Sequence, residues 1–291
     1  MVGEFLNHKN FIGIFIHAPL LKGQQVFSAS TSCELRSKSF DLKQCHLKPI
    51  RLNTWRRNIF ITFNDDAAPL EEFLGEFEED FGFLQIENCR LADRYVIDVA
   101  YNWKFVHENL MDFYHVGVLH ARSFGSTVLW DTSNVKLKEA GGITIWYDGA
   151  PATPSGKTLV GKMPWLENRP ESFASMGFRW PNLVMFGRID SVKLMISWPV
   201  DVHRTLLTIY QLFPQAVFDQ PDIEKKFKIY HDHTVNFIEE DRFMVESMQR
   251  AMGSVHYRPG RMSTAEKSLH HTMNAYLDRI FGQSNRQEAA E

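Results

Sequence analysis

The most restrictive feature of this sequence is a series of strand-like segments that leads directly into one long amphipathic helix. The segments are rich in β-branched and aromatic residues and are separated by short polar turns such as Asp190-Ser191. Consecutive strands joined in this way pair as an antiparallel sheet. The helix is predicted over 220–253, with Pro221 near its start and Gly253 at its end. The strand segments lie at 127–140, 142–148, 182–189, 192–200 and 204–214.

Segments on either side complete this pattern. The last predicted helix opens with a capping-box sequence, in which Ser263 precedes Glu266 by three residues. Together the elements predict an α+β fold in which an antiparallel sheet wraps around a long helix. The additional strands are predicted at 58–64 and 94–102, and the additional helices at 68–81, 103–115 and 263–282.

Composition limits the class of function. With 291 residues, 44% of them hydrophobic, the chain can bury one substantial core and a small second unit. It has 32 Lys and Arg against 35 Asp and Glu, a net charge of -3. This balance argues against nucleic acid or a membrane surface as a partner. The aromatic content of 13% suffices for a packed core and for the lining of an apolar pocket.

Cysteine usage and hydropathy indicate a protein of the cytoplasm. Cys33, Cys45 and Cys89 are too few and too scattered for a disulfide framework, which fits a reducing compartment. No apolar run reaches the roughly 18 residues of a membrane span. The apolar segment 11–21 is interrupted by His17 and lacks the features of a signal peptide, so we interpret it as a core strand.

One acid and two histidines lie within the nine residues "DFYHVGVLH" (112–120). On a helix, Asp112 and His115 share a face, whereas His120 lies about 140° away from His115. The two imidazoles can meet only if the helix bends or ends between them, which Gly117 would allow. The alternative interpretation is that both are core histidines bonded to backbone carbonyls.

A third candidate ligand lies in the long helix. Asp241 falls on the apolar stripe of that helix, three residues after Ile238 and three before Met244. A lone carboxylate on an inward face is costly unless the helix turns it to the rim or an arginine neutralises it. Two imidazoles and one carboxylate form a set that holds non-haem Fe(II) and leaves positions open for O2. Zinc is the competing metal.

These residues lie in segments that resemble the catalytic domain of the large subunit of Rieske non-haem iron ring-hydroxylating oxygenases. "NWKFVHENLMDFYHVGVLHARSFG" (102–125) resembles the family's ligand signature, "EEDRFMVESMQRAM" (239–252) its carboxylate segment, and 180–200 the sheet between them. The similarity extends over about 46–282. It implies a helix-grip fold of the START/Bet v 1 type.

The resemblance also assigns roles to individual residues. His115, His120 and Asp241 would bind a mononuclear Fe(II). Asp112 would hydrogen-bond a ligand histidine and link the iron to the electron-donating cluster of a neighbouring subunit, and a carboxylate behind a ligand imidazole fixes its tautomer. Asn109 would lie close to the iron.

The N-terminal region departs from the family. Family members hold a [2Fe-2S] cluster with Cys-x-His and Cys-x2-His, and none of Cys33, Cys45 and Cys89 is followed by either pattern. Segments 17–23 and 40–64 resemble the tail of the cluster-bearing domain. We therefore expect residues 1–64 to be a remnant of that tail without a cluster, and residues 65–291 to form the catalytic iron domain.

The resemblance implies an oxygenase that uses O2 to hydroxylate or demethylate a small aromatic or apolar substrate, as in aromatic hydrocarbon catabolism. Electrons would come from a separate Rieske protein or ferredoxin and a reductase, and the assembly could be a homotrimer. The alternative is a helix-grip protein that binds a hydrophobic ligand without catalysis.

Several further residues bear on the pocket. Segment 150–157 is rich in Pro, Ser and Gly and is expected to form a loop at the pocket mouth. Tyr114, Phe178 and Trp180 could line the pocket or belong to the core. His231 and His233 are surrounded by charged residues and are predicted to lie on a solvated helix face.

Overall fold

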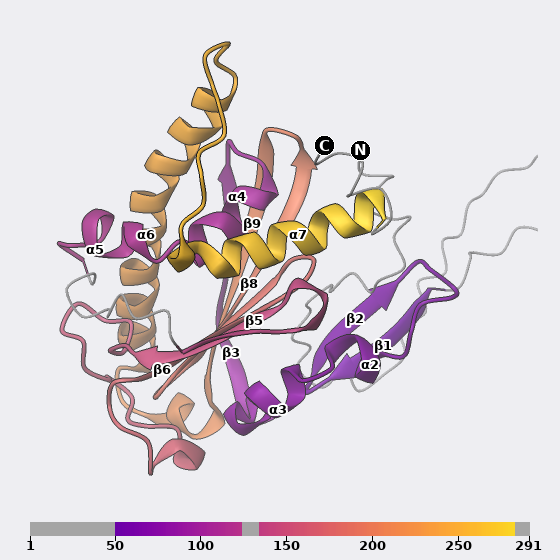
Figure 1. Cartoon of the computed structure of the whole chain (residues 1–291). Coiled ribbons are helices and arrows are strands. Elements are labelled where there is room, and N and C mark those ends of the chain that lie inside the picture. The colour runs from indigo at the N-terminus through magenta and orange to yellow at the C-terminus, as the bar shows by residue number, and fades with distance from the viewer. Residues whose placement is uncertain (1–49, 124–133, 283–291) are drawn as a thin grey trace, which may run out of the picture.

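The computed structural model describes residues 50–123 and 134–282. Its centre is a seven-stranded antiparallel sheet with the strand order β3-β9-β8-β7-β6-β5-β4 (Figure 1). The sheet contains the predicted succession of strands, and the turn at Asp190-Ser191 joins two of them as expected. The strands are β3 Cys89–Val99, β4 Val135–Leu137, β5 Ile143–Asp148, β6 Phe173–Arg179, β7 Leu183–Arg188, β8 Val192–Asp201 and β9 Arg204–Pro214.

Two helices, α4 and α5, lie between β3 and β4 in the chain, and two more, α6 and α7, follow β9. The longest of them, α6, packs against the sheet. Ile238 and Val245 of α6 belong to the same buried cluster as Val184 and Met195 of the sheet. Leu269 of α7 packs against this cluster as well. The predicted α+β fold, with the sheet wrapped around a long helix, is therefore confirmed (Figure 1). The helices are α4 Trp103–Met111, α5 Tyr114–Leu119, α6 Ile223–Met252 and α7 Lys267–Phe281.

A second layer covers the opposite face of the sheet. The hairpin of β1 (Arg51–Trp55) and β2 (Asn58–Thr62) and the short helices α2 (Leu70–Leu74) and α3 (Phe77–Phe81) share one buried cluster with Leu183 and Leu194. The prediction of a single helix over 68–81 is wrong. Gly75 has φ +50°, a left-handed value outside the helical range, and it separates α2 from α3.

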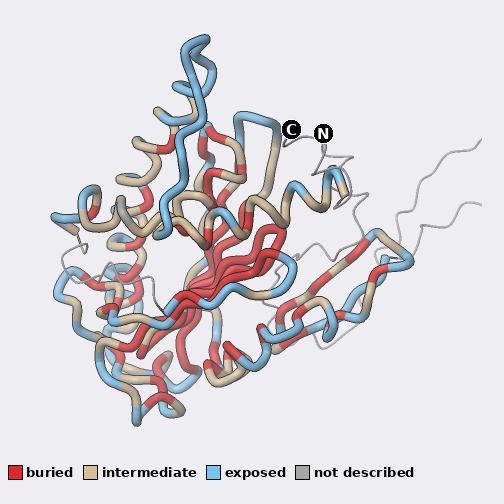
Figure 2. Tube along the Cα trace, viewed as in Figure 1, coloured by how far each residue is buried: buried red, intermediate tan, exposed pale blue. Residues whose placement is uncertain are grey.

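Burial on both faces of the sheet explains why one strand was missed. All seven residues of β6 are buried, so the strand lacks the alternation of apolar and polar residues that marks a half-exposed strand (Figure 2). At Gly177 an added Cβ would lie 2.2 Å from the ring of Phe81, so this glycine makes room for the helix layer. Glycine and serine weaken the strand signal of this segment.

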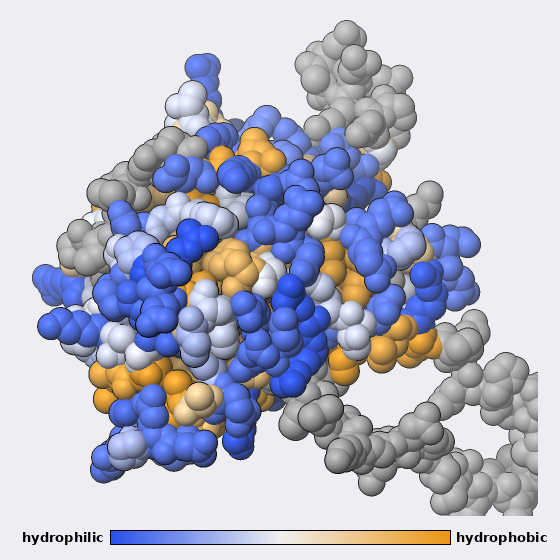
Figure 3. Space-filling model, turned by 90° about the horizontal axis from the view of Figure 1, so that it is seen from below, coloured by the Kyte–Doolittle hydropathy of each residue, from blue (hydrophilic) through white to orange (hydrophobic). Residues whose placement is uncertain are grey.

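The hydropathy of one face of the molecule and the length of the described helices bear on contact with a membrane. The face seen from below is mostly hydrophilic, with hydrophobic patches that are separate from one another (Figure 3). Within the described ranges, no helix is both long enough and apolar enough to cross a membrane.

Candidate metal centre

The segment around the two histidines is broken twice. α4 ends at Met111, and Asp112 is extended with φ -85° and ψ 102°. α5 then runs through Gly117 and ends at Leu119, and His120 has the non-helical angles φ -93° and ψ 15°. The helix therefore ends between the two histidines, as expected, but it does so at Leu119 and not at Gly117. The chain changes direction before His115 and again at His120, and this brings the two imidazoles to the same side.

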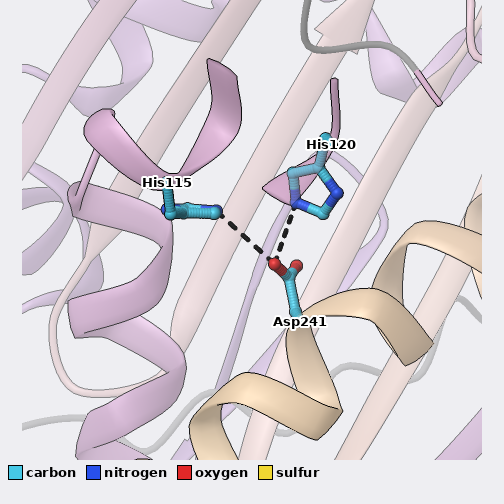
Figure 4. A group of neighbouring side chains, drawn as sticks. All are labelled: His115, His120 and Asp241. Carbon is cyan, nitrogen blue, oxygen red and sulfur yellow. Dashed lines mark ion pairs between the residues drawn. The ribbon is translucent and has the colours of Figure 1, made fainter. Parts of the chain in front are cut away.

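The third side chain comes from α6. Asp241 Oδ1 lies 3.4 Å from His115 Nε2 and 2.9 Å from His120 Nε2. Figure 4 shows both imidazole rings pointing at this carboxylate from α5 and its C-terminal end. One potential ligand atom from each of the three residues lies within 4.8 Å of the others. The structure thus brings together residues that are more than a hundred positions apart in the sequence.

The alternatives considered for Asp241 do not hold. Its side chain is only 15% exposed, so the helix does not turn it to the rim. The adjacent Arg242 bonds Glu246 and Glu239 instead of neutralising Asp241. Asp241 instead faces two imidazoles in a largely buried site, and this needs a physical explanation.

The carboxylates around His115 and His120 favour a positive charge between the three side chains. Burial opposes the protonation of His115, but the Asp112 and Asp241 carboxylates outweigh it and raise the pKa of His115 to about 9. Burial also opposes the protonation of His120, yet Asp241 and Glu240 raise the pKa of His120 above its usual value. Burial would raise the pKa of Asp241, and the two imidazoles hold it below its usual value instead.

The hydrogen bonding fits a cation between the three side chains. Asp241 Oδ1 is buried and makes no geometrically acceptable hydrogen bond to another described residue, although two Nε2 atoms lie nearby. Buried polar atoms without partners are uncommon and need an explanation such as an ion. Neutral imidazole nitrogens and a carboxylate oxygen are ligands suited to Fe(II) or Zn²⁺. The donor set therefore fits a mononuclear divalent metal.

Two further carboxylates stand behind the imidazoles. Asp112 Oδ2 lies 3.8 Å from His115 Nδ1, beyond hydrogen-bond distance. Glu240 Oε2 lies 2.7 Å from His120 Nδ1 and also accepts a hydrogen bond of 2.8 Å from Ser123 Oγ. A carboxylate bonded to Nδ1 holds the proton there and leaves Nε2 free to bind a metal. Glu240 was missed by the sequence analysis, although it directly precedes Asp241.

Replacing Glu240 by Ala is expected to weaken metal binding by about tenfold, because His120 loses the group that fixes its tautomer and ring orientation. Metal titration of the purified variant measures this change. Glu239→Ala is the matched control, since Glu239 is exposed and bonds Arg242. Equal affinity in the Glu240 variant and the wild type would contradict the positioning role.

A cavity of about 290 Å³ adjoins the three side chains. Segment 149–156 forms part of its wall, which confirms the predicted loop at the pocket. Asn109 also lines it, and Asn109 Oδ1 is buried with no hydrogen-bond partner among the described residues. The apolar part of the lining comes from Leu110, Phe113, Val116, Met176, Phe186, Met195, Phe237 and Ile238.

Other residues considered for the pocket have different surroundings. Phe178 and Trp180 belong to the buried cluster between sheet and helices and are not part of the cavity lining. The side chain of Tyr114 lies outside the described part of the structure. His231 is about one-third exposed and bonds Asp93. His233 lines the cavity, so the prediction of a solvated helix face is wrong for this residue.

Comparison with known proteins gives a consistent result. The family model described as ring hydroxylating alpha subunit (catalytic domain) matches residues 86–282. Glycine betaine monooxygenase oxygenase subunit of Pseudomonas aeruginosa is 24% identical over 86% of this chain, and carnitine monooxygenase oxygenase subunit of Acinetobacter pittii is 27% identical over 88%. The chain spans 65% of the first relative's length and 67% of the second's.

Solved structures show the same fold at low identity. The structure of a quaternary ammonium Rieske monooxygenase superimposes with a TM-score of 0.65 at 21% identity, covering 85% of this chain and 65% of the other. Naphthalene 1,2-dioxygenase with bound indole gives a TM-score of 0.64 at 16% identity, covering 87% and 69%. The fold is thus the helix-grip fold. Because the family match covers well over half of its residues, the chain belongs to the ring-hydroxylating alpha subunit family.

Proposed function

We propose that this protein is the catalytic part of a non-haem iron oxygenase that hydroxylates or demethylates a small substrate with O2. The observation that carries this proposal is the meeting of His115, His120 and Asp241 at the wall of a largely apolar cavity. Three protein ligands leave coordination positions open on an Fe(II) ion. Zinc suits the same ligands, but the oxygenase family match favours iron.

The bound iron would supply the activation of O2, and the residues of this chain would do the rest. His115, His120 and Asp241 would hold the metal. The apolar walls would exclude water and orient the substrate. Asn109 would offer its amide oxygen, which has no partner among the described residues, to a donor close to the metal. Asp112, whose side chain is 35% exposed, would be the point at which electrons enter the site from outside.

The reaction needs electrons in addition to O2. Insertion of one oxygen atom into a C–H bond releases the other as water and consumes two electrons and two protons. We propose that a separate Rieske protein or ferredoxin and a reductase supply them. Residues 1–64 would be a cluster-free remnant of a Rieske-domain tail, residues 65–291 the iron domain, and the assembly a homotrimer. Inter-subunit electron transfer is described for one structural neighbour, a quaternary ammonium Rieske monooxygenase, which supports an electron donor outside the iron domain.

The cavity lining supports a substrate with an apolar reacting part, aromatic or aliphatic. Relatives are named for glycine betaine and carnitine, and others for anthranilate and 2-aminobenzenesulfonate, so both aliphatic and aromatic compounds are candidates for this chain. The second candidate function is binding of such a compound without catalysis, which the apolar cavity alone would support.

The test is iron analysis followed by O2 uptake. Protein purified without oxygen and reconstituted with Fe(II) is expected to hold about one iron per chain, given one such ligand group in the described residues. With a Rieske protein, a reductase and NADH, substrate-dependent O2 uptake is expected. Bound iron without any O2 uptake across small aromatic acids and betaines would favour the binding protein, and bound zinc alone would contradict the oxygenase.

A further inference from the structure

We infer that the β7–β8 end of the cavity binds the carboxylate group of a small substrate, through Lys193 and Arg188. The inference rests on the proposed function only in taking the cavity beside the metal ligands as the substrate site. It narrows the substrate class from any small apolar compound to one with an apolar reacting part and an acidic end.

Strand register places both cations on the cavity wall. Side chains two residues apart share a face, so Phe186 and Arg188 of β7 point to the same side, as do Lys193 and Met195 of β8. Phe186 pairs directly with Lys193 across the two strands. All four residues line the cavity. The two positive groups are therefore fixed by rigid sheet geometry and lie beside apolar neighbours.

Lys193 is a buried cation. It is only 9% exposed, and its Nζ donates a hydrogen bond of 2.7 Å to Thr234 Oγ1. An ammonium group has three donors, and Thr234 accounts for one of them. Burial and the neighbouring Arg188 lower the pKa of Lys193 to about 7. An anion beside Nζ would offset this cost of charging the group.

Arg188 is held at the same wall in a space made for it. Its guanidinium lies 5.1 Å from the centre of the Tyr147 ring. Its Nη1 is buried and has no hydrogen-bond partner among the described residues. Gly149 leaves room for it, since an added Cβ at that position would lie 2.1 Å from Nη1. An unpaired guanidinium nitrogen beside a cavity is a ready donor to a carboxylate oxygen.

Among the described residues, Asp190 is an acid whose charge acts on both cations, but it forms no ion pair with either. Within residues 50–123 and 134–282, no carboxylate oxygen forms an ion pair within 4.0 Å of Lys193 or Arg188. The carboxylate of Asp190 is fully buried, and its charge favours the protonated form of Lys193. Its oxygens accept hydrogen bonds from Tyr230 at 2.5 Å and from Ser191 at 3.1 Å. Uncompensated buried charge is costly, and a ligand anion would relieve it.

The two cations and the metal ligands are close enough for one small molecule to contact both. The Phe237 ring lies 5.2 Å from Lys193 Nζ and 6.3 Å, centre to centre, from the His120 ring. The Phe237 ring is therefore in contact range of both Lys193 and the metal ligand His120. A substrate could lie along Phe237 with its carboxylate at Lys193 and Arg188 and its reacting carbon at the iron.

The test compares matched charged and neutral probes on the iron-loaded full chain. The pairs are benzoate and benzamide, phenylacetate and phenylacetamide, and glycine betaine and its amide, with inorganic phosphate as a further arm. Calorimetry is expected to give at least about tenfold tighter binding of the carboxylate in one or more pairs. Lys193→Met and Arg188→Met should each remove most of this preference while the iron content stays unchanged.

Lys136→Met is the control, because Lys136 lies over the Trp146 ring and is not part of the cavity lining. It should keep the carboxylate preference. A lysine that serves stability would give a lower Tm when replaced, whereas Lys193→Met is expected to keep or raise the Tm because a buried charge is removed.

Several outcomes would overturn the inference. Two concern the wild-type protein: amides that bind as tightly as the matched carboxylates, or no saturable binding of any carboxylate. The others are inorganic phosphate that binds more tightly than every carboxylate, and a carboxylate preference that remains in both Lys193→Met and Arg188→Met. The iron measurement separates this inference from the proposed function. If iron-loaded wild-type protein shows no preference for carboxylates, only the anion site is contradicted. If the protein prefers carboxylates but retains no iron after reconstitution, only the oxygenase proposal is contradicted.

Discussion

Replacing Asp241 by Ala is expected to weaken Fe(II) binding by more than about 100-fold and to abolish O2-dependent turnover. Loss of a group that only supports a ligand commonly costs about 10–100-fold, so loss of the one carboxylate in the set should cost more. The two remaining imidazoles would also face each other without the negative charge that raises the pKa of both. Iron content after anaerobic reconstitution is the measurement.

The matched control for this variant lies on the same helix. Asp232 is exposed on α6 and pairs with Lys228, so Asp232→Ala removes one carboxylate that is not part of the cavity lining. It should bind iron as the wild type does. Circular dichroism of both variants checks that α6 is retained. Stoichiometric iron in folded Asp241→Ala protein would remove Asp241 from the ligand set.

Replacing Asp112 by Asn is expected to leave iron bound and to lower turnover with the Rieske partner by about 10–100-fold. Asn has almost the same shape as Asp, but it has no charge to stabilise a proton on His115, whose Nδ1 lies 3.8 Å from Asp112 Oδ2. Asp112 is also the more exposed of these two side chains, at 35% against 9%, and could contact an electron donor.

The decisive measurement for Asp112 separates reduction of the iron from binding of the iron. Stopped-flow mixing with a reduced Rieske protein should show slow reduction of ferric protein in the variant, while a small chemical reductant should act equally on variant and wild type. Asp98→Asn is the control, because Asp98 pairs with the exposed Arg204 outside the cavity. Equal rates with the Rieske protein would contradict the electron-entry role.

The sequence was sufficient to predict the three side chains that meet, because each carries a local signal. Asp241 interrupts an apolar stripe of regular helical spacing, so the period predicted an inward direction, and the structure excludes the alternative that the helix turns it to the rim. His115 and His120 lie in an apolar run in which two imidazoles need partners. The long helix and the antiparallel sheet followed from periodicity and turn residues in the same way.

Other parts of the site depend on tertiary geometry that no local pattern encodes. The two breaks at Asp112 and His120 are backbone angles, and the sequence indicated Gly117 where the helix in fact continues to Leu119. Lys193 and Arg188 lie in strands buried on both faces, where only the register between β7 and β8 decides which side chains reach the cavity. Glu240 is one of three consecutive acids, and its role depends on the rotation of α6.

One ferrous ion is expected to bind between α5 and α6, and anomalous X-ray scattering tests this most directly. Crystals of the iron-loaded protein would be measured on both sides of the iron absorption edge. The predicted result is a single strong iron peak within coordination distance of His115 Nε2, His120 Nε2 and an Asp241 carboxylate oxygen. A peak elsewhere, or no iron peak from protein that fully retains its fold, would contradict the account.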